Sequence, residues 1–196
     1  MVRPVKNSSE AVKVFLGVNL HEILDLDEKN QILNLNAWLR YNWSDYQLSW
    51  NPEDYGGITD VRFPARAIWK PDVLLYNSVA ETFNSAYESK MIVFHDGTVK
   101  WEPPGIFRLA CKIDITFFPF DEQNCHFKFG SWSYTGRELD LQQQDSGLDT
   151  SVFTINGEWK ILATNVNRTV KIYHYPGGPE PYIDLKFFIH IRRRTL

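Results

Sequence analysis

The chain has 196 residues, of which 43% are hydrophobic and 23% charged, a composition typical of one large or two small globular domains. Its formal net charge of −3 gives no electrostatic basis for binding nucleic acid. The sequence shows neither a signal peptide nor an apolar run long enough to cross a membrane, so we expect the chain as given to be soluble.

Alternation of apolar and polar residues predicts β-strands near 12–20, over 33–43 and near 187–191. The apolar faces consist of Val12, Val14, Leu16, Val18 and Leu20; Leu33, Leu35, Ala37, Leu39, Tyr41 and Trp43; and Phe187, Ile189 and Ile191. Turn signals such as Asp96-Gly97 separate the runs, and no convincing helical period is present. We therefore expect an all-β, immunoglobulin-like sandwich of about ten short strands.

One large apolar residue, Trp38, lies on the polar face of the 33–43 strand, where its neighbours include Asn36 and Arg40. It is covered by a loop or a second subunit, or it is free to contact a ligand. The pattern alone also allows packing within the monomer, and it favours neither interpretation.

Two cysteines, Cys111 and Cys125, are the only ones in the chain and enclose 13 residues. Bonded to each other, they would close a loop worth about 3 kcal/mol in the chain-entropy picture. The tip of this loop is apolar and contains Phe118, Pro119 and Phe120. An ordinary disulfide of a secreted domain would explain the cysteines, but an apolar tip indicates docking on another surface.

The spacing of the cysteines, the Phe-Pro-Phe-Asp sequence of 118–121 and the following Lys-Phe-Gly-Ser-Trp of 128–132 resemble the signature loop of Cys-loop pentameric ligand-gated ion channels. The closest resemblance is to nicotinic acetylcholine receptor subunits. It implies that 1–196 form one extracellular ligand-binding domain of a pentameric cation channel subunit in the cell membrane. A C-terminal pore domain is then missing from the sequence, beyond the basic end at 192–194.

Five aromatic residues match the nicotinic aromatic box by local motif. The resemblance assigns Tyr76, Trp132, Tyr175 and Tyr182 to the principal side of a site between subunits, and Trp38 to the complementary side. Taken singly, each is more often a core or turn residue. Together they suit a cation such as acetylcholine, because each ring face attracts a quaternary ammonium by about 0.5–2 kcal/mol.

The complementary side implied by the resemblance also includes Ile92, Lys100 and Glu102. With Arg40 near Trp38, this surface would carry two cations, which would weaken a cationic ligand by Coulomb repulsion. These charges could equally belong to a solvated rim.

One departure from the nicotinic pattern concerns the loop between Tyr175 and Tyr182. Nicotinic alpha subunits carry two adjacent cysteines there, whereas this chain has Gly177-Gly178. Glycine adds conformational freedom that is lost when a loop closes over a ligand. The sequence therefore does not identify the natural ligand. It also allows an accessory subunit that assembles with others but binds no agonist.

The resemblance also implies coupling residues at the membrane end of the domain. These are the apolar tip, Phe118, Pro119 and Phe120, and a charge pair between Glu28 and Arg193. Without the resemblance, the two charges would be read as solvated surface groups. The apolar tip favours a channel subunit over a soluble acetylcholine-binding protein, which is the remaining alternative.

We expect no enzymatic activity, metal or cofactor. The five histidines lack metal-ligand spacing, and no nucleophile elbow or phosphate-binding loop occurs. Three glycosylation sequons begin at Asn7, Asn42 and Asn167, and like a single disulfide they suit an extracellular protein that passes through the secretory pathway.

Overall fold

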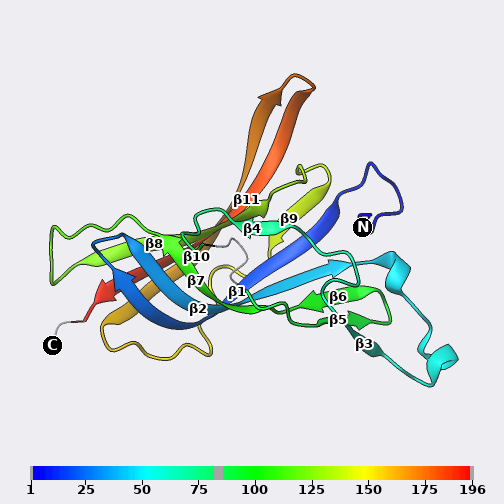
Figure 1. Cartoon of the computed structure of the whole chain (residues 1–196), viewed down its shortest axis with the longest axis horizontal. Helices are drawn as coiled ribbons and strands as arrows, with labels where there is room; N and C mark the ends of the chain where they lie inside the picture. The colour runs from blue at the N-terminus through cyan, green and yellow to red at the C-terminus, as the bar shows by residue number, and fades with distance from the viewer. Residues whose placement is uncertain (1, 82–85, 195–196) are drawn as a thin grey trace.

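The computed structural model describes residues 2–81 and 86–194, and these form two facing β-sheets (Figure 1). The first sheet has the order β3-β5-β6-β2-β1-β9, and β7 also pairs with β2. The second sheet has the order β10-β11-β8-β4. The strands are β1 (Val12–Asp27), β2 (Ile32–Ser44), β3 (Asp60–Phe63), β4 (Val73–Leu75), β5 (Met91–Phe94), β6 (Thr98–Trp101), β7 (Pro104–Ala110), β8 (Glu122–Ser131), β9 (Leu139–Gln143), β10 (Trp159–Tyr175) and β11 (Gly178–Arg193).

The predicted all-β sandwich is confirmed, and its core consists of the alternating residues that the sequence indicated. Every residue predicted for the apolar faces of β1, β2 and β11 is buried. Side chains alternate across a strand, so these residues point between the sheets while their polar neighbours point outward. Two short 3₁₀ helices, η1 (Tyr46–Leu48) and η2 (Pro52–Tyr55), connect β2 to β3. No helix in the described ranges has the length and apolarity needed to cross a membrane.

The strands differ from the prediction in length. The described chain contains eleven strands, and β1, β10 and β11 have 16, 17 and 16 residues, so these three are not short. The outer half of the β10–β11 hairpin projects from the body of the molecule (Figure 1). There β11 pairs only with β10, because its pairing with β8 begins at Asp184.

A disulfide joins Cys111 to Cys125, with a Cα–Cα distance of 5.2 Å. Cys111 directly follows β7 in the first sheet and Cys125 lies within β8 of the second, so the bond links the two sheets. The loop between the cysteines carries exposed Phe118 and Phe120 at its tip, and the Phe118-Pro119 peptide bond is cis. Figure 1 shows this loop at the same end of the molecule as the described C-terminus.

The end of β11 carries a buried guanidinium, that of Arg193, which is only 8% exposed. It forms ion pairs with Glu28 at 2.6 Å, with Asp121 at 2.8 Å and with Glu158 at 2.5 Å. It also lies over the rings of Trp159 and Phe118, at 4.3 and 5.0 Å from their centroids. These residues form the Arg193 cluster, which joins the β1–β2 turn, the disulfide loop and the β9–β10 connection.

Burial alone would raise the pKa of the Asp121 carboxyl, but hydrogen bonds from Arg193 and Gln123 outweigh it and hold the pKa below its ordinary value. A carboxyl with a depressed pKa stabilises the folded state at pH values above its unfolded pKa, about 3.9 for aspartate. That stabilisation is lost as the pH falls through the folded pKa.

Replacing Arg193 by leucine should lower the free energy of unfolding by about 3–5 kcal/mol at pH 7, because it leaves the Asp121 carboxylate buried without its partner. Urea denaturation followed by tryptophan fluorescence measures the change.

In the native chain, the free energy of unfolding should fall below about pH 4, and this fall should be shallower in Asp121→Asn.

Arg192→Leu is the matched control. Arg192 lies one residue away and pairs with Glu122, and these side chains are 54% and 36% exposed. Exposed ion pairs contribute about 0–1 kcal/mol, so this variant should lose less than 1 kcal/mol. Equal losses for Arg192→Leu and Arg193→Leu would contradict a special role for the Arg193 cluster.

Candidate functional site

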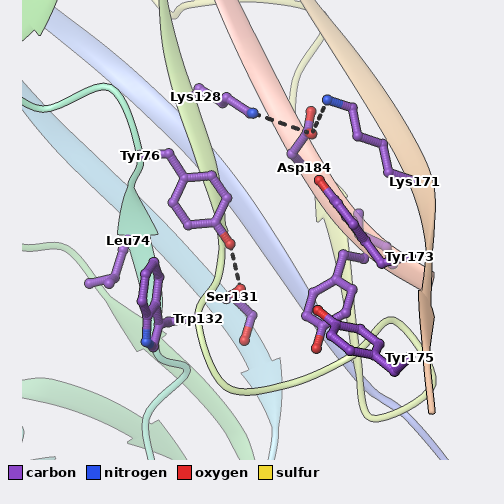
Figure 2. Close-up of a pocket in the computed structure, with 11 residues that line it drawn as sticks. Leu74, Tyr76, Lys128, Ser131, Trp132, Lys171, Tyr173, Tyr175 and Asp184 are labelled. Carbon is purple, nitrogen blue, oxygen red and sulfur yellow. Dashed lines mark hydrogen bonds and ion pairs between the residues drawn. The ribbon is translucent and has the colours of Figure 1, made fainter. Parts of the chain in front are cut away.

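A pocket of about 620 Å³ opens on the outer side of the second sheet, between the end of β8 and the projecting hairpin (Figure 2). Five aromatic rings dominate its lining, those of Tyr76, Trp132, Tyr173, Tyr175 and Tyr182. We call this cavity the aromatic pocket. The remaining lining residues are Leu74, Lys128, Ser131, Lys171, Ile183 and Asp184.

Tyr76 directly follows β4 and crosses β8 at Gly130. A Cβ at Gly130 would lie 2.6 Å from the Tyr76 ring, so a residue with a side chain there would push the ring away. The Tyr76 hydroxyl donates a hydrogen bond of 2.5 Å to the carbonyl oxygen of Ser131. Burial, followed by the nearby carboxylates of Asp72 and Asp184, raises the pKa of Tyr76 to about 12, so the hydroxyl stays neutral at physiological pH.

Trp132 follows β8 and is 70% exposed, an unusual position for a tryptophan. Its ring meets that of Tyr76 edge-on, with 6.4 Å between centroids. Asp72 holds the residues on both sides of Trp132, because its carboxylate accepts hydrogen bonds from the Ser131 hydroxyl and from the backbone N–H of Ser133. The indole is thus presented to solvent on a fixed segment.

The projecting hairpin supplies three tyrosines to the same pocket. Tyr182 on β11 lies 6.3 Å from Tyr175 and 5.6 Å from Tyr173, measured between ring centroids. A hydrogen bond with Tyr175, more than desolvation, raises the pKa of Tyr182. The sequence interpretation missed Tyr173, although its position two residues before Tyr175 places both side chains on one face of β10.

The sequence interpretation also missed a charged group at the pocket wall. Asp184 is buried, and its carboxylate lies 3.9 Å from the Lys128 ammonium and 4.0 Å from that of Lys171 (Figure 2). Lys128 also lies 5.6 Å from the centroid of the Tyr76 ring. A cation of the protein therefore already interacts with Tyr76, which leaves Trp132 and the hairpin tyrosines as the rings open to a further cation.

The tip of the hairpin holds Gly177 and Gly178, and Gly178 has a φ of +116°, which favours glycine. Side chains added at either position would meet nothing within 4 Å. Contacts with the β8–β9 connection hold the hairpin instead. The Gly136 N–H donates to the Pro181 carbonyl at 2.7 Å, and Arg137 donates to the Pro179 carbonyl at 3.2 Å.

The residues expected on a complementary side do not line this pocket. Trp38, Ile92 and Lys100 lie on β2, β5 and β6 of the first sheet, and exposed Glu102 directly follows β6. Ile92 is paired with Lys100 across β5 and β6, and Lys100 is paired with Asn42 of β2. Asn42 and Trp38 are four residues apart on β2 and point to the same side, so Ile92, Lys100 and Trp38 lie on one face of the sheet. One chain therefore carries two separate surfaces, the aromatic pocket and the outer face of the first sheet.

The sequence interpretation gave that outer face two cations, Arg40 and Lys100, and the structure pairs Arg40 with carboxylates of the same chain. The Arg40 guanidinium binds the carboxylate of Asp145 and lies 3.7 Å from that of Asp149. Its charge is thus compensated within the chain by the β9–β10 connection. Lys100 is exposed and lies over the Phe94 ring at 5.2 Å.

The remaining predicted residues lie at other surfaces. Glu28 and Arg193 are in contact, and the Phe118–Phe120 tip lies beside them, but neither group touches the aromatic pocket. Asn7 and Asn167 are exposed and Asn42 is half-buried. The described residues contain no group of three acidic, histidine or cysteine side chains that could hold a metal.

Comparison with known proteins gives close relatives. The acetylcholine receptor subunit alpha-type acr-16 of Caenorhabditis elegans is 58% identical over 194 residues, covering 99% of this chain and 39% of the relative. The neuronal acetylcholine receptor subunit beta-3 of Gallus gallus is 45% identical over 178 residues, covering 89% and 39%. The human neuronal subunit alpha-2 is 43% identical over 194 residues, covering 99% and 36%.

The chain thus spans about two fifths of the length of these relatives. Residues 1–195 match the sequence model described as the neurotransmitter-gated ion-channel ligand binding domain. Both findings agree with the resemblance carried by the loop between Cys111 and Cys125. The chain belongs to the neurotransmitter-gated ion-channel ligand binding domain family, as an extracellular domain of the nicotinic acetylcholine receptor subunit type.

Proposed function

We propose that this domain binds a small cationic amine such as acetylcholine between subunits of a pentameric, nicotinic-receptor-like cation channel and couples binding to pore opening. The observation that carries the proposal is the convergence of Trp132, Tyr175 and Tyr182 on one open pocket. These rings come from separate parts of the chain. Trp132 is 70% exposed, although a tryptophan is usually well buried, so core packing does not explain its position. Ring faces arranged in this way suit a cation that cannot donate a conventional hydrogen bond.

The second half of the site is proposed to come from a neighbouring subunit. Trp38 is 42% exposed on the outer face of the first sheet, together with Ile92, Lys100 and Glu102. The aromatic pocket and this face lie on different sheets, and a ring of like subunits joins two different faces at each interface. Five interfaces would then give five equivalent sites, in a pentamer of identical or related subunits.

Signal transmission is proposed to run through the other end of β11. The exposed Phe118-Pro119-Phe120 tip would meet a pore domain in the membrane, and the Glu28–Arg193 pair would connect that tip to β11. The domain would accordingly lie on the extracellular side of a cell membrane, with sugars at some of Asn7, Asn42 and Asn167. An apolar tip of this kind favours a channel subunit over a soluble binding protein.

An accessory subunit that assembles but binds no agonist is the second candidate. Gly177-Gly178 at the hairpin tip favours it, because ordering two glycines over a ligand opposes binding. The two candidates differ in one measurable property, which is the response of Trp132 to an amine.

Titration of the assembled protein with tetramethylammonium should change its tryptophan fluorescence, because the cation would lie against the indole of Trp132. Trp132→Ala should abolish the saturable change. Trp132→Phe should keep binding but weaken it by roughly 3- to 30-fold, because phenylalanine attracts a cation less than tryptophan does.

Trp50→Phe controls for a general loss of signal. Trp50 lies in a different surface groove near η2, so its variant should keep the native dissociation constant. No response to a panel of amines by the native protein would support the accessory subunit and contradict ligand binding.

Joined to a pore domain, the chain should give currents that depend on Phe120. Phe120→Ser should shift the agonist concentration for half-maximal current upward by at least severalfold, with little change in stability because Phe120 is exposed. Two-electrode recording in oocytes measures the shift, and surface labelling confirms expression.

Tyr55→Ser is the matched control for the loss of an exposed ring. Tyr55 lies in η2, at the end of the molecule opposite the disulfide loop (Figure 1), and its variant should leave the currents unchanged. Equal effects of the two variants would argue against coupling through the apolar tip.

A further inference from the structure

Three charged groups line the aromatic pocket, those of Lys128, Lys171 and Asp184. The two ammonium groups lie 3.9 and 4.0 Å from the same oxygen, Oδ2 of Asp184. A hydrogen bond between such groups needs a distance of about 2.7–3.2 Å, so neither ammonium is hydrogen-bonded to the carboxylate. The three groups together carry one positive charge in excess, and both lysines keep hydrogen-bond donors that a ligand could use.

Lys171 is the less constrained of the two lysines. Lys128 also lies over the Tyr76 ring, at 5.6 Å from its centroid, and its side chain is 27% exposed. The side chain of Lys171 is 45% exposed, and Asp184 is the acid with which it pairs among the described residues. A lysine ammonium is a point charge on a flexible stem, so Lys171 can turn toward an acceptor in the pocket.

The register of the hairpin places Lys171 beside the rings of the pocket. Lys171 is paired with Tyr182 across β10 and β11, so their side chains are direct neighbours on one face. Tyr175 lies four residues further along β10 on the same face. Figure 2 shows the two lysines grouped around Asp184, away from Trp132 and Tyr175. A short ligand with its ammonium group among the rings can therefore extend its other end toward Lys171.

The charge at the ring end of the pocket has the opposite sign. The carboxylate of Asp72 is held by hydrogen bonds from Ser131 and Ser133, the two neighbours of Trp132. It is close enough to Tyr76 to contribute, after burial, to the raised pKa of that hydroxyl. An acid near Trp132 and ammonium groups near Tyr182 make the pocket dipolar. Such a pocket favours a ligand that is positive at one end and negative at the other.

We propose that the aromatic pocket takes a zwitterionic amine, with its ammonium group among the rings and an anionic oxygen group on Lys171. Lys171 is then a specificity-determining residue. The inference rests on the proposed function, since it requires a cationic amine at Trp132, and it adds that a short linker joins this amine to a carboxylate or a similar anion. In a pocket without the lysines, a carboxylate would lose its hydration without replacement, and an uncharged analogue would bind better.

Matched pairs of ligands, titrated into the assembled protein, test this inference. Each pair is a zwitterion and its methyl ester, which keeps the quaternary ammonium but loses the negative charge. Trimethylglycine and γ-butyrobetaine supply two linker lengths, and tryptophan fluorescence gives the dissociation constants. In the native protein, the zwitterion of at least one length should bind roughly three- to tenfold more tightly than its ester, as expected for a charge-assisted hydrogen bond at a partly exposed site.

Three variants locate the origin of this preference. Lys171→Gln should bring the ratio of the two dissociation constants close to one or reverse it, because the ammonium that holds the carboxylate is lost. Lys171→Arg should keep the preference, because it keeps a positive charge and its donors. Lys160→Gln is the matched control, because Lys160 is exposed at the opposite end of the same strand. It should keep the native ratio.

An ester that binds as tightly as its zwitterion, or more tightly, at both linker lengths would overturn the inference. So would a preference for the zwitterion that Lys171→Gln leaves unchanged. In both results an amine binds, so the proposed function stands. If no ligand of either pair binds and tetramethylammonium does not bind either, the proposed function itself is contradicted, and this inference falls with it.

Discussion

The pairing of β11 with β10 and β8 is the constraint on which the rest of the structure depends. One strand carries Tyr182 into the aromatic pocket, places Asp184 between two lysines, lines the core with Phe187, and ends at Arg193. A strand rises about 3.3 Å per residue, so these groups are spread along more than 30 Å of one continuous element. The pocket and the buried Arg193 cluster are therefore opposite ends of the same strand.

The buried faces of the sheets could be predicted from the sequence because period-two alternation needs only local information. Leu35 and Leu39 of β2 and Ile189 of β11 are buried as their positions indicated. The lengths of β10 and β11 could not be predicted in this way. The outer half of their hairpin carries partly or fully exposed residues on both faces, so alternation gives no signal there.

Four of the five rings of the aromatic pocket were identified through local motifs, whereas the lysines and Asp184 were not. Lys128, Lys171 and Asp184 come from three strands, and no short motif records which strands pair or in which register. No sequence motif indicates the need for a glycine at Gly130 either. That need follows from the Tyr76 ring, which crosses β8 at this position.

The length of β11 also restricts how this chain can change in evolution. Tyr182 and Arg193 lie on opposite faces of the strand, one toward the aromatic pocket and the other toward the Arg193 cluster. Insertion or deletion of a single residue between them would turn one of the two to the wrong face. Insertion or deletion of two residues would keep both side chains on their faces but would shift the pairing of β11 with β8 and β10. Substitutions within this segment therefore disturb the two ends of β11 less than insertions or deletions do.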